Sequence, residues 1–191
     1  MEKTDKRDRV IRAALELIAE HGFHDAPMAL IAQKADVAAG TIYRFFENKD
    51  VLINELYRQV EEKIFSYLQD GYPVEKPIRE RFLHLCTALL HYFITHPLDF
   101  RYVEQFHNSP YGVDHRRSKI LGKKGECDVF RNLFEEGVAQ QVMKNLPMTI
   151  LFALSFGPLI TLARDHILGF INLDDALILS TGEACWDGIR R

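Results

Sequence analysis

The stretch GFHDAPMALIAQKADVAAGTIYRFFENKDVL, residues 22–52, has the pattern of two short helices joined by a tight turn. Apolar residues at three- and four-residue spacing predict one helix over about residues 27–35 and a second that ends near Phe46. The few residues from Asp36 to Ala39 separate the two helices, and Gly40 opens the second. These are the dimensions of a helix-turn-helix, whose second helix enters the major groove of DNA.

The second of these helices begins with small residues, which allow its backbone to approach the edges of bases. Its opposite side, with Ile42, Phe45 and Phe46, is expected to anchor it in a small core. The residues predicted to contact DNA are Ala38, Ala39, Gly40, Thr41, Tyr43, Arg44 and Lys49. Arg44 is the candidate among them for reading a base edge, because a guanidinium can bond to a base through two N–H groups.

Lys49 is expected at the start of the next helix, where Asn48 offers a side-chain oxygen as the N-cap. Its charge there adds to the free N–H groups and to the positive end of the helix dipole, which together hold a phosphate. A simpler interpretation of Lys49 is a solvated lysine at a helix start. A simpler interpretation of Tyr43 is a tyrosine half-buried between helices. The motif as a whole favours contact with DNA.

Helical periodicity continues on both sides of this segment, and no sustained two-residue alternation appears. A first helix is predicted over about residues 5–21 and ends at Gly22, and a long helix follows Asn48. The last is predicted over about residues 173–190. The sequence therefore predicts an all-α fold of about nine helices.

The charge of the chain is nearly balanced, with a formal net charge of −3 and a pI near 6.2. The first 50 residues hold eight basic and nine acidic side chains. A strongly basic nucleic-acid binder is excluded, so any DNA-binding surface must be a local patch of a few cations and backbone N–H groups. The basic stretch 115–124 is interpreted as the solvated start of a helix that continues to Gly137, with a second nucleic-acid patch as the alternative.

Residues 22–52 closely resemble the N-terminal signature of the tetracycline repressor (TetR) family of bacterial regulators. The rest of the chain matches that family only in the number, order and approximate length of its helices. The resemblance implies a DNA-binding domain over residues 1–48 and a helical ligand-binding and dimerisation domain over residues 49–191. It also implies a homodimeric repressor that binds double-stranded operator DNA and leaves it when a small apolar or aromatic effector binds.

By position, the resemblance assigns contact with operator phosphates or bases to Thr41 and Tyr43, and phosphate binding to Lys49. Ala39 departs from the polar residue often found at that point, which puts sequence-specific contact from the turn in doubt. Asp36 stands where the family usually has glycine. If the backbone there is left-handed, the aspartate costs on the order of 1 kcal/mol.

Aromatic residues are frequent in the predicted fifth to eighth helices, and together they suggest an apolar effector cavity. The residues predicted to line it are His91, Tyr92, Phe93, Tyr102, Phe106, Phe130, Phe134, Phe152 and Phe156. Arg101, Glu104 and His107 are further polar candidates for orienting the effector. Plain core packing is the alternative for each aromatic residue taken singly.

The last two helices are predicted to pair with those of a second copy as a four-helix bundle. The predicted seam residues are Leu151, Leu154, Leu159, Leu162, Ile178, Gly182, Cys185 and Ile189. Gly182 would allow the helices to approach closely. The apolar run of residues 148–163 is expected to fall short of the roughly 20 residues that cross a bilayer.

The sequence lacks the usual signatures of enzymes: no G-x-S-x-G, P-loop or dinucleotide-binding glycine motif is present. Cys86, Cys127 and Cys185 form no C-x-x-C, and no metal site or cofactor is expected. The first nine residues are almost all charged or polar, so we expect a cytoplasmic protein without a signal peptide. The alternative function is a helical ligand-binding or interaction protein whose helix-turn-helix is structural only.

Overall fold

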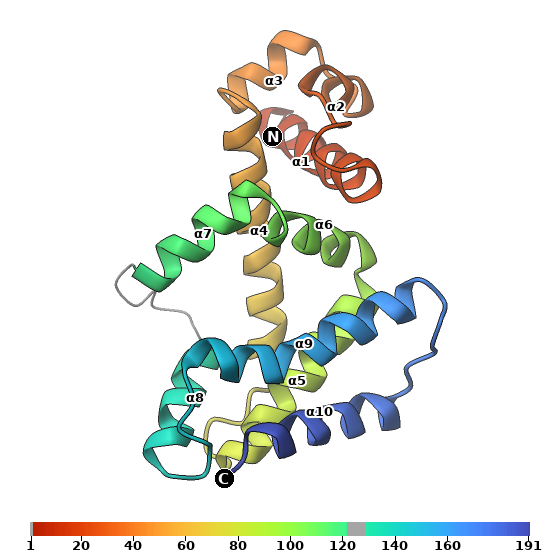
Figure 1. Ribbon diagram of the computed structural model, residues 1–191. Coiled ribbons are helices and arrows are strands. Elements are labelled where there is room, and N and C mark those ends of the chain that lie inside the picture. Colours follow the sequence, from red (N-terminus) through yellow and green to blue (C-terminus); the bar gives the residue numbers. More distant parts are fainter. Residues whose placement is uncertain (1, 122–128) are drawn as a thin grey trace. The chain divides into compact units, whose positions relative to one another are not determined.

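The computed structural model describes residues 2–121 and 129–191, which contain ten α-helices and no strand (Figure 1). The helices are α1 Glu2–His21, α2 Met28–Lys34, α3 Ala39–Phe45, α4 Lys49–Gln69, α5 Ile78–Thr95, α6 Pro97–His107, α7 Pro110–Leu121, α8 Val129–Ala139, α9 Met148–Ile167 and α10 Asp175–Ile189. The predicted all-α fold is confirmed. The helix expected from the basic stretch to Gly137 is two helices, α7 and α8; Cys127 and the end of that stretch lie outside the described residues.

The chain forms two compact units, and the division between them falls within α4. The first unit comprises residues 1–63 and 96–122, and the second comprises residues 64–95 and 123–191. The helices α6 and α7 thus pack in the same unit as the helix-turn-helix, a grouping different from the predicted division after residue 48. That division, which concerns function, stays a prediction.

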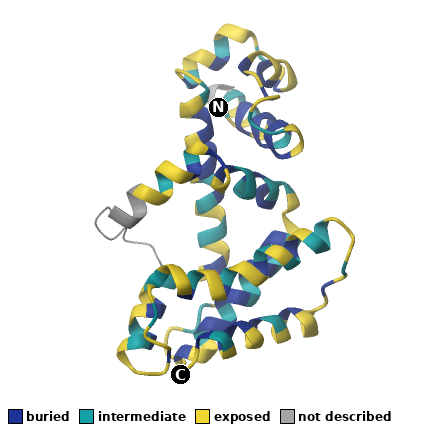
Figure 2. Ribbon diagram, in the orientation of Figure 1, coloured by how far each residue is buried: buried dark blue, intermediate teal, exposed yellow. Residues whose placement is uncertain are grey.

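The first unit is built around α1, which packs against α2 and α6. Its apolar residues recur every three or four positions, and Figure 2 shows buried residues along α1. Val10, Ala14 and Ile18 are fully buried. Two side chains of α6 also bond to backbone oxygens of the unit: Tyr102 Oη donates to Ile53 O at 2.6 Å, and Gln105 Nε2 donates to Ala19 O at 3.2 Å. Helix α6 is therefore fastened to α1 and α4, the helices that precede and follow the helix-turn-helix.

The second unit is centred on α5, which packs against α8, α9 and α10. The helices α9 and α10 also pack against each other. The helix α9 continues through Pro158 over 20 residues, so it extends beyond the apolar run of residues 148–163. By length and composition alone it could cross a membrane, which is weak evidence because core helices of soluble proteins share these properties.

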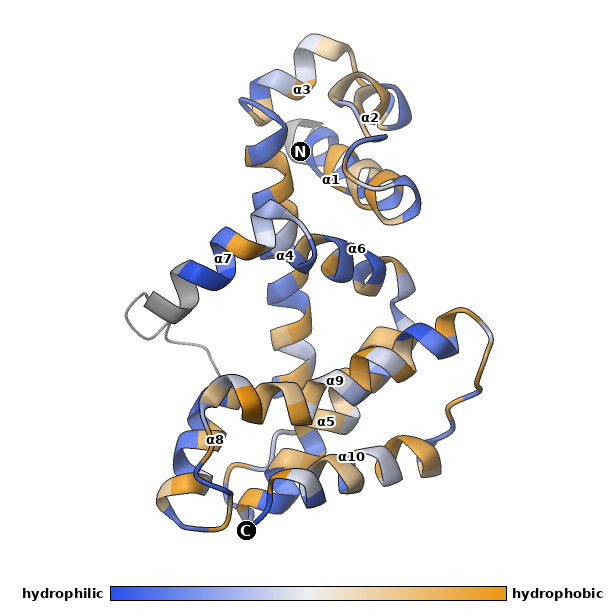
Figure 3. Cartoon of the chain, viewed as in Figure 1, coloured by the Kyte–Doolittle hydropathy of each residue, from blue (hydrophilic) through white to orange (hydrophobic). Residues whose placement is uncertain are grey.

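The predicted dimer seam is wrong for most of its residues, because the chain buries them itself. Leu151, Leu159, Ile178, Gly182, Cys185 and Ile189 are buried within the unit, Leu162 is half-buried, and Leu154 is exposed. A Cβ on Gly182 would lie 3.3 Å from Leu83 Cδ2, so this glycine lets α10 approach α5 of its own chain. Figure 3 shows hydrophobic residues along much of α9 and α10. Some of their apolar side chains remain exposed: Ile150, Leu154, Leu177 and Leu179.

Candidate functional site

The helix α3 presents one buried and one exposed side. Ile42 is buried, and so is Phe46, the residue directly after the helix. Phe45 is only half-buried. On the other side Tyr43 is 56% exposed and Arg44 is exposed. The small residues 38–40 at the start of α3 are exposed as well, and Thr41 is half-buried. The predicted DNA-contacting residues of α3 thus share an accessible side that a buried anchor holds in place.

The turn between α2 and α3 ends α2 with a Schellman motif. Asp36 N–H donates to Gln33 O at 3.1 Å, and Val37 N–H donates to Ala32 O at 3.0 Å. Asp36 is left-handed, with φ of 52°, as its alignment with the family's glycine suggested. Its carboxylate accepts a hydrogen bond from Arg9 Nη1 at 3.3 Å, which ties the turn to α1.

Lys49, the predicted phosphate ligand, begins α4 and is half-buried. Asn48 Oδ1 accepts from Val51 N–H at 2.9 Å, which confirms the predicted N-cap. Lys49 Nζ donates to the backbone oxygen of Phe23, and burial lowers the pKa of the ammonium group although Asp50 and Asp25 raise it. The cation therefore also fastens the α1–α2 loop to α4, a contact that the sequence did not reveal.

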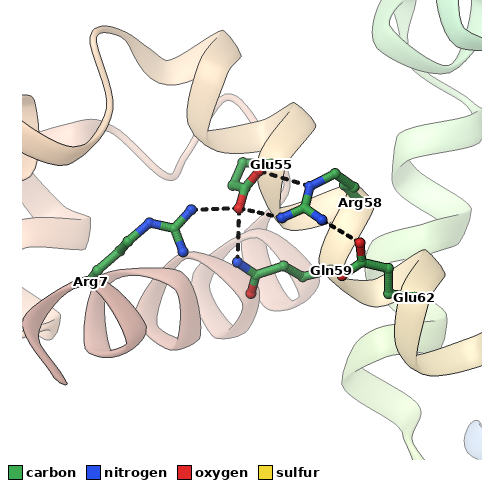
Figure 4. Close-up of polar contacts among 5 residues, drawn as sticks. All are labelled: Arg7, Glu55, Arg58, Gln59 and Glu62. Carbon is green, nitrogen blue, oxygen red and sulfur yellow. Dashed lines mark hydrogen bonds and ion pairs between the residues drawn. The ribbon is translucent and has the colours of Figure 1, made fainter. Parts of the chain in front are cut away.

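Glu55 connects α4 to α1 through a network of hydrogen bonds (Figure 4). Its Oε1 accepts from Arg7 Nη2 at 2.5 Å, from Arg58 Nη2 at 2.9 Å and from Gln59 Nε2 at 3.1 Å. The hydrogen bonds from Arg58, together with those from Arg7 and Gln59, lower the pKa of Glu55 to about 2, while burial opposes them. The network fixes the start of α1 on the helix that carries Lys49.

We expect Glu55→Gln to lower the free energy of unfolding by about 1 kcal/mol at neutral pH, a value reduced for partial exposure to solvent. Because folding lowers the pKa from 4.5, the carboxylate's contribution is complete above pH 4.5 and is lost as the pH falls towards 2. Urea unfolding at about pH 7 and about pH 3.5 should show the gap between variant and parent shrinking at the lower pH. Glu62→Gln, which removes only a partner of Arg58, is the matched control; equal effects of the two substitutions would contradict the prediction.

The predicted cavity residues do not lie together. Tyr102 and Phe106 belong to the core of the first unit, where the ring of Phe106 stacks on Tyr57 with centroids 3.8 Å apart. His107, one of the polar candidates, lies in the same unit, 3.2 Å from Tyr57 Oη through its Nε2. Arg101 completes this group on α6.

Four of the predicted aromatic residues meet between α8 and α9 in the second unit. The centroids of Phe130 and Phe156 are 4.4 Å apart, those of Phe134 and Phe152 are 5.2 Å apart, and those of Phe152 and Phe156 are 5.4 Å apart. Phe134 is fully buried and the other three are half-buried. We call these four residues the phenylalanine cluster; it is the part of the predicted effector site that the fold assembles.

The remaining predicted residues lie on α5 in the same unit. Tyr92 and Phe93 are buried, and Tyr92 packs edge-on against Tyr67 with centroids 5.3 Å apart. His91 Nε2 lies 3.7 Å from Asp175 Oδ1.

Ser155 is a candidate that the sequence analysis missed. Its hydroxyl is fully buried and has no hydrogen-bond partner in the described part of the chain. It lies on α9 one turn from Phe152, within the buried stripe of Leu151 and Leu159. A buried hydroxyl without a partner costs about 1–3 kcal/mol. The signal in the sequence was a lone serine in an otherwise apolar helical stripe.

The described residues show neither a metal site nor a reactive thiol. No group of three His, Cys, Asp or Glu side chains within residues 2–121 and 129–191 could hold a metal ion. Cys86 and Cys185 are free and buried, and burial raises the pKa of both thiols. Neither thiol is therefore activated as a nucleophile.

Family models match both the N-terminal and the C-terminal part of the chain. A family model described as bacterial regulatory proteins, tetR family, matches residues 10–56, and one described as tetracyclin repressor-like, C-terminal domain, matches residues 77–190. A TetR-family transcriptional regulator from Haemophilus influenzae is 26% identical, with 100% of both chains covered and a TM-score of 0.83. One from Vibrio parahaemolyticus is 32% identical, with 97% of this chain and 99% of that chain covered and a TM-score of 0.77.

A more distant likeness concerns the fold alone. The transcriptional regulator FadR from Bacillus subtilis, solved in complex with stearoyl-CoA, is 19% identical, with a TM-score of 0.73. The comparison covers 94% of this chain and 95% of that chain.

Proposed function

Because the chain belongs to the TetR family of bacterial transcriptional regulators, we propose that it is a dimeric repressor that a small apolar effector releases from its operator. The observation that carries the proposal is the accessible side of α3, with Tyr43 and Arg44 exposed while Ile42 anchors the helix from behind. A helix so mounted can enter the major groove without unfolding its own core. The protein would act in the cytoplasm, where the DNA lies.

A dimer related by a two-fold axis presents two copies of α3. It should therefore bind a pseudo-palindrome whose half-sites lie roughly 34–36 Å apart, or a multiple of that distance. The exposed apolar side chains Ile150, Leu154, Leu177 and Leu179 support a dimer through α9 and α10, although only Leu154 among them belongs to the predicted seam. In this arrangement the buried stripes of the two helices stay within each subunit.

The effector is proposed to bind at the phenylalanine cluster, with Ser155 as the group that would bond to a polar atom of the ligand. Half-buried rings, and an unpaired hydroxyl on the same helix as two of them, suit a largely apolar molecule with one hydrogen-bonding group. FadR from Bacillus subtilis, which shares the fold, was solved with stearoyl-CoA. Long-chain acyl-CoA is therefore the first class of compound to test.

We expect Arg44→Ala and Lys49→Ala to weaken DNA binding in different ways. A duplex enriched from a randomised library by the parent protein serves as the specific probe, and a random duplex serves as the non-specific one. Arg44→Ala should cost about 1–3 kcal/mol on the specific duplex and mainly relax preference at one base pair, because the guanidinium reads a base edge. Lys49→Ala should weaken both complexes and lower the slope of log K against log salt by about one.

Fluorescence anisotropy over a salt series measures both effects, and Lys76→Ala, an exposed cation of the second unit, is the control. Thermal unfolding of Lys49→Ala is recorded in parallel, since that variant also loses the bond to Phe23 O. Equal losses of Arg44→Ala on both duplexes would show that Arg44 does not read sequence. If the parent protein enriches no sequence at all, a helix-turn-helix with a purely structural role becomes the better explanation.

A further inference from the structure

We propose that Tyr111 is a positioning residue for DNA contact, which holds the carboxylate of Asp50 away from the phosphate site at the start of α4. The inference rests on the proposed DNA-binding function and adds to it a residue from α7, far along the chain from the helix-turn-helix. All the groups involved lie in the first compact unit.

Tyr111 contacts two of the elements around Lys49. Its Oη donates to Asp50 Oδ1 at 2.6 Å across 61 positions of sequence. Its ring packs against Phe23 with centroids 5.5 Å apart, and Phe23 O is the acceptor for Lys49 Nζ. One tyrosine therefore contacts both the neighbour of Lys49 on α4 and the loop residue to which Lys49 is bonded.

The corner between α6 and α7 fixes the place of Tyr111. Ser109 Oγ donates to Phe106 O at 2.7 Å, and a Cβ added to Gly112 would lie 2.6 Å from His107 Cα. The first turn of α7 thus packs directly on the end of α6, closer than any residue other than glycine allows. The ring of Tyr111 stacks on Phe106 in this corner, with centroids 6.4 Å apart.

Asp50 is the acidic residue in the first turn of α4. The N–H groups and the dipole at a helix start attract a carboxylate as well as a phosphate, so a mobile Asp50 would compete with DNA and repel it. The hydrogen bond from Tyr111 holds this carboxylate towards α7. Burial and the bond to Asp50 raise the pKa of Tyr111 to about 12, so its hydroxyl remains a donor at neutral pH.

The experiment is a double-mutant cycle of Tyr111→Phe and Asp50→Asn, measured by fluorescence anisotropy on the enriched duplex and on a random duplex. Tyr111→Phe keeps the ring and its packing but frees the carboxylate. We expect it to weaken binding to both duplexes about tenfold at low salt, the order of the repulsion between two unit charges a few ångströms apart near a protein surface. The loss should shrink as KCl rises from about 50 to 200 mM, because the repulsion is between charges.

Asp50→Asn removes the charge, so adding Tyr111→Phe to it should change affinity less than about twofold. Tyr72→Phe, which removes a hydroxyl bonded to Arg81 Nε in the second unit, should bind DNA like the parent. A tenfold loss that persists in the Asp50→Asn background would make Tyr111 a packing residue only and overturn the proposal. Unchanged binding by Tyr111→Phe would overturn it too, while leaving the proposed function standing. Failure of the parent protein to bind any duplex would instead refute the proposed function, and with it this inference.

Discussion

Leu154→Glu is expected to convert the proposed dimer into a monomer of 22.1 kDa at micromolar concentration. Leu154 is 40% exposed on α9, and Gly157 and Pro158, one turn further along the same helix, are exposed as well. In a two-fold interface the substitution appears twice, so two carboxylates would be buried near each other without a partner. Each uncompensated charge costs several kcal/mol, so dimerisation should weaken at least about 100-fold.

Sedimentation velocity measures this change directly. Val74→Glu, which places the same charge at an exposed valine outside α9 and α10, should leave the dimer intact. The monomeric variant should also lose most of its affinity for the enriched duplex, because each chain then binds only one half-site. A parent protein that sediments as a monomer would refute the proposed dimer, and a dimeric Leu154→Glu would place the interface elsewhere.

Phe156→Ala is expected to abolish most of the response to an effector while leaving effector-free DNA binding nearly unchanged. Phe156 contacts three other rings of the phenylalanine cluster, so its removal takes away the centre of the proposed site. The residues proposed to contact DNA belong to the other compact unit, so this substitution should not disturb them. The variant should lose most of a coupling free energy of about 1–3 kcal/mol between ligand and DNA, which corresponds to roughly 5- to 150-fold in affinity.

A thermal-shift screen of the parent protein, started with stearoyl-CoA and simpler apolar and aromatic compounds, identifies the compound to use. DNA affinity is then measured with and without it for the parent, for Phe156→Ala and for Phe170→Ala, an exposed phenylalanine outside the cluster. Linkage requires that DNA weaken binding of the compound by the same factor as the compound weakens binding of DNA. A folded Phe156→Ala that responds like the parent would place the effector site elsewhere.

The route of coupling proposed for this response runs through α4. This helix has 21 residues, so it is about 32 Å long. Its first part, to Lys63, belongs to the unit with the helix-turn-helix, and the remainder belongs to the unit with the phenylalanine cluster. A tilt forced on its far end would shift the reading helices, and a dimer must hold these at a fixed spacing to dock on both half-sites at once.

The sequence by itself determined the elements whose signals are local. Periodicity and capping predicted α1, the N-cap Asn48 and the short helices around Asp36, because these depend on residues within a turn or two of one another. The anchoring side of α3 was also predictable, because an amphipathic helix has only one apolar stripe to bury. The alignment of Asp36 with a family glycine raised a left-handed backbone there as a condition, and the structure meets it.

Only the tertiary structure decided which side of a helix with several apolar stripes faces inward. The helix α9 is apolar on most sides, so spacing could not tell the stripe of Leu151 and Leu159, which packs within the chain, from that of Ile150 and Leu154. Likewise, no local signal placed the ring of Phe106 in the unit of the helix-turn-helix, or the hydroxyl of Tyr111 on Asp50, 61 positions away. Such contacts join residues that are distant in sequence. They are selected by the free energy of packing among several helices, and the periodicity of a single helix carries no information about that packing.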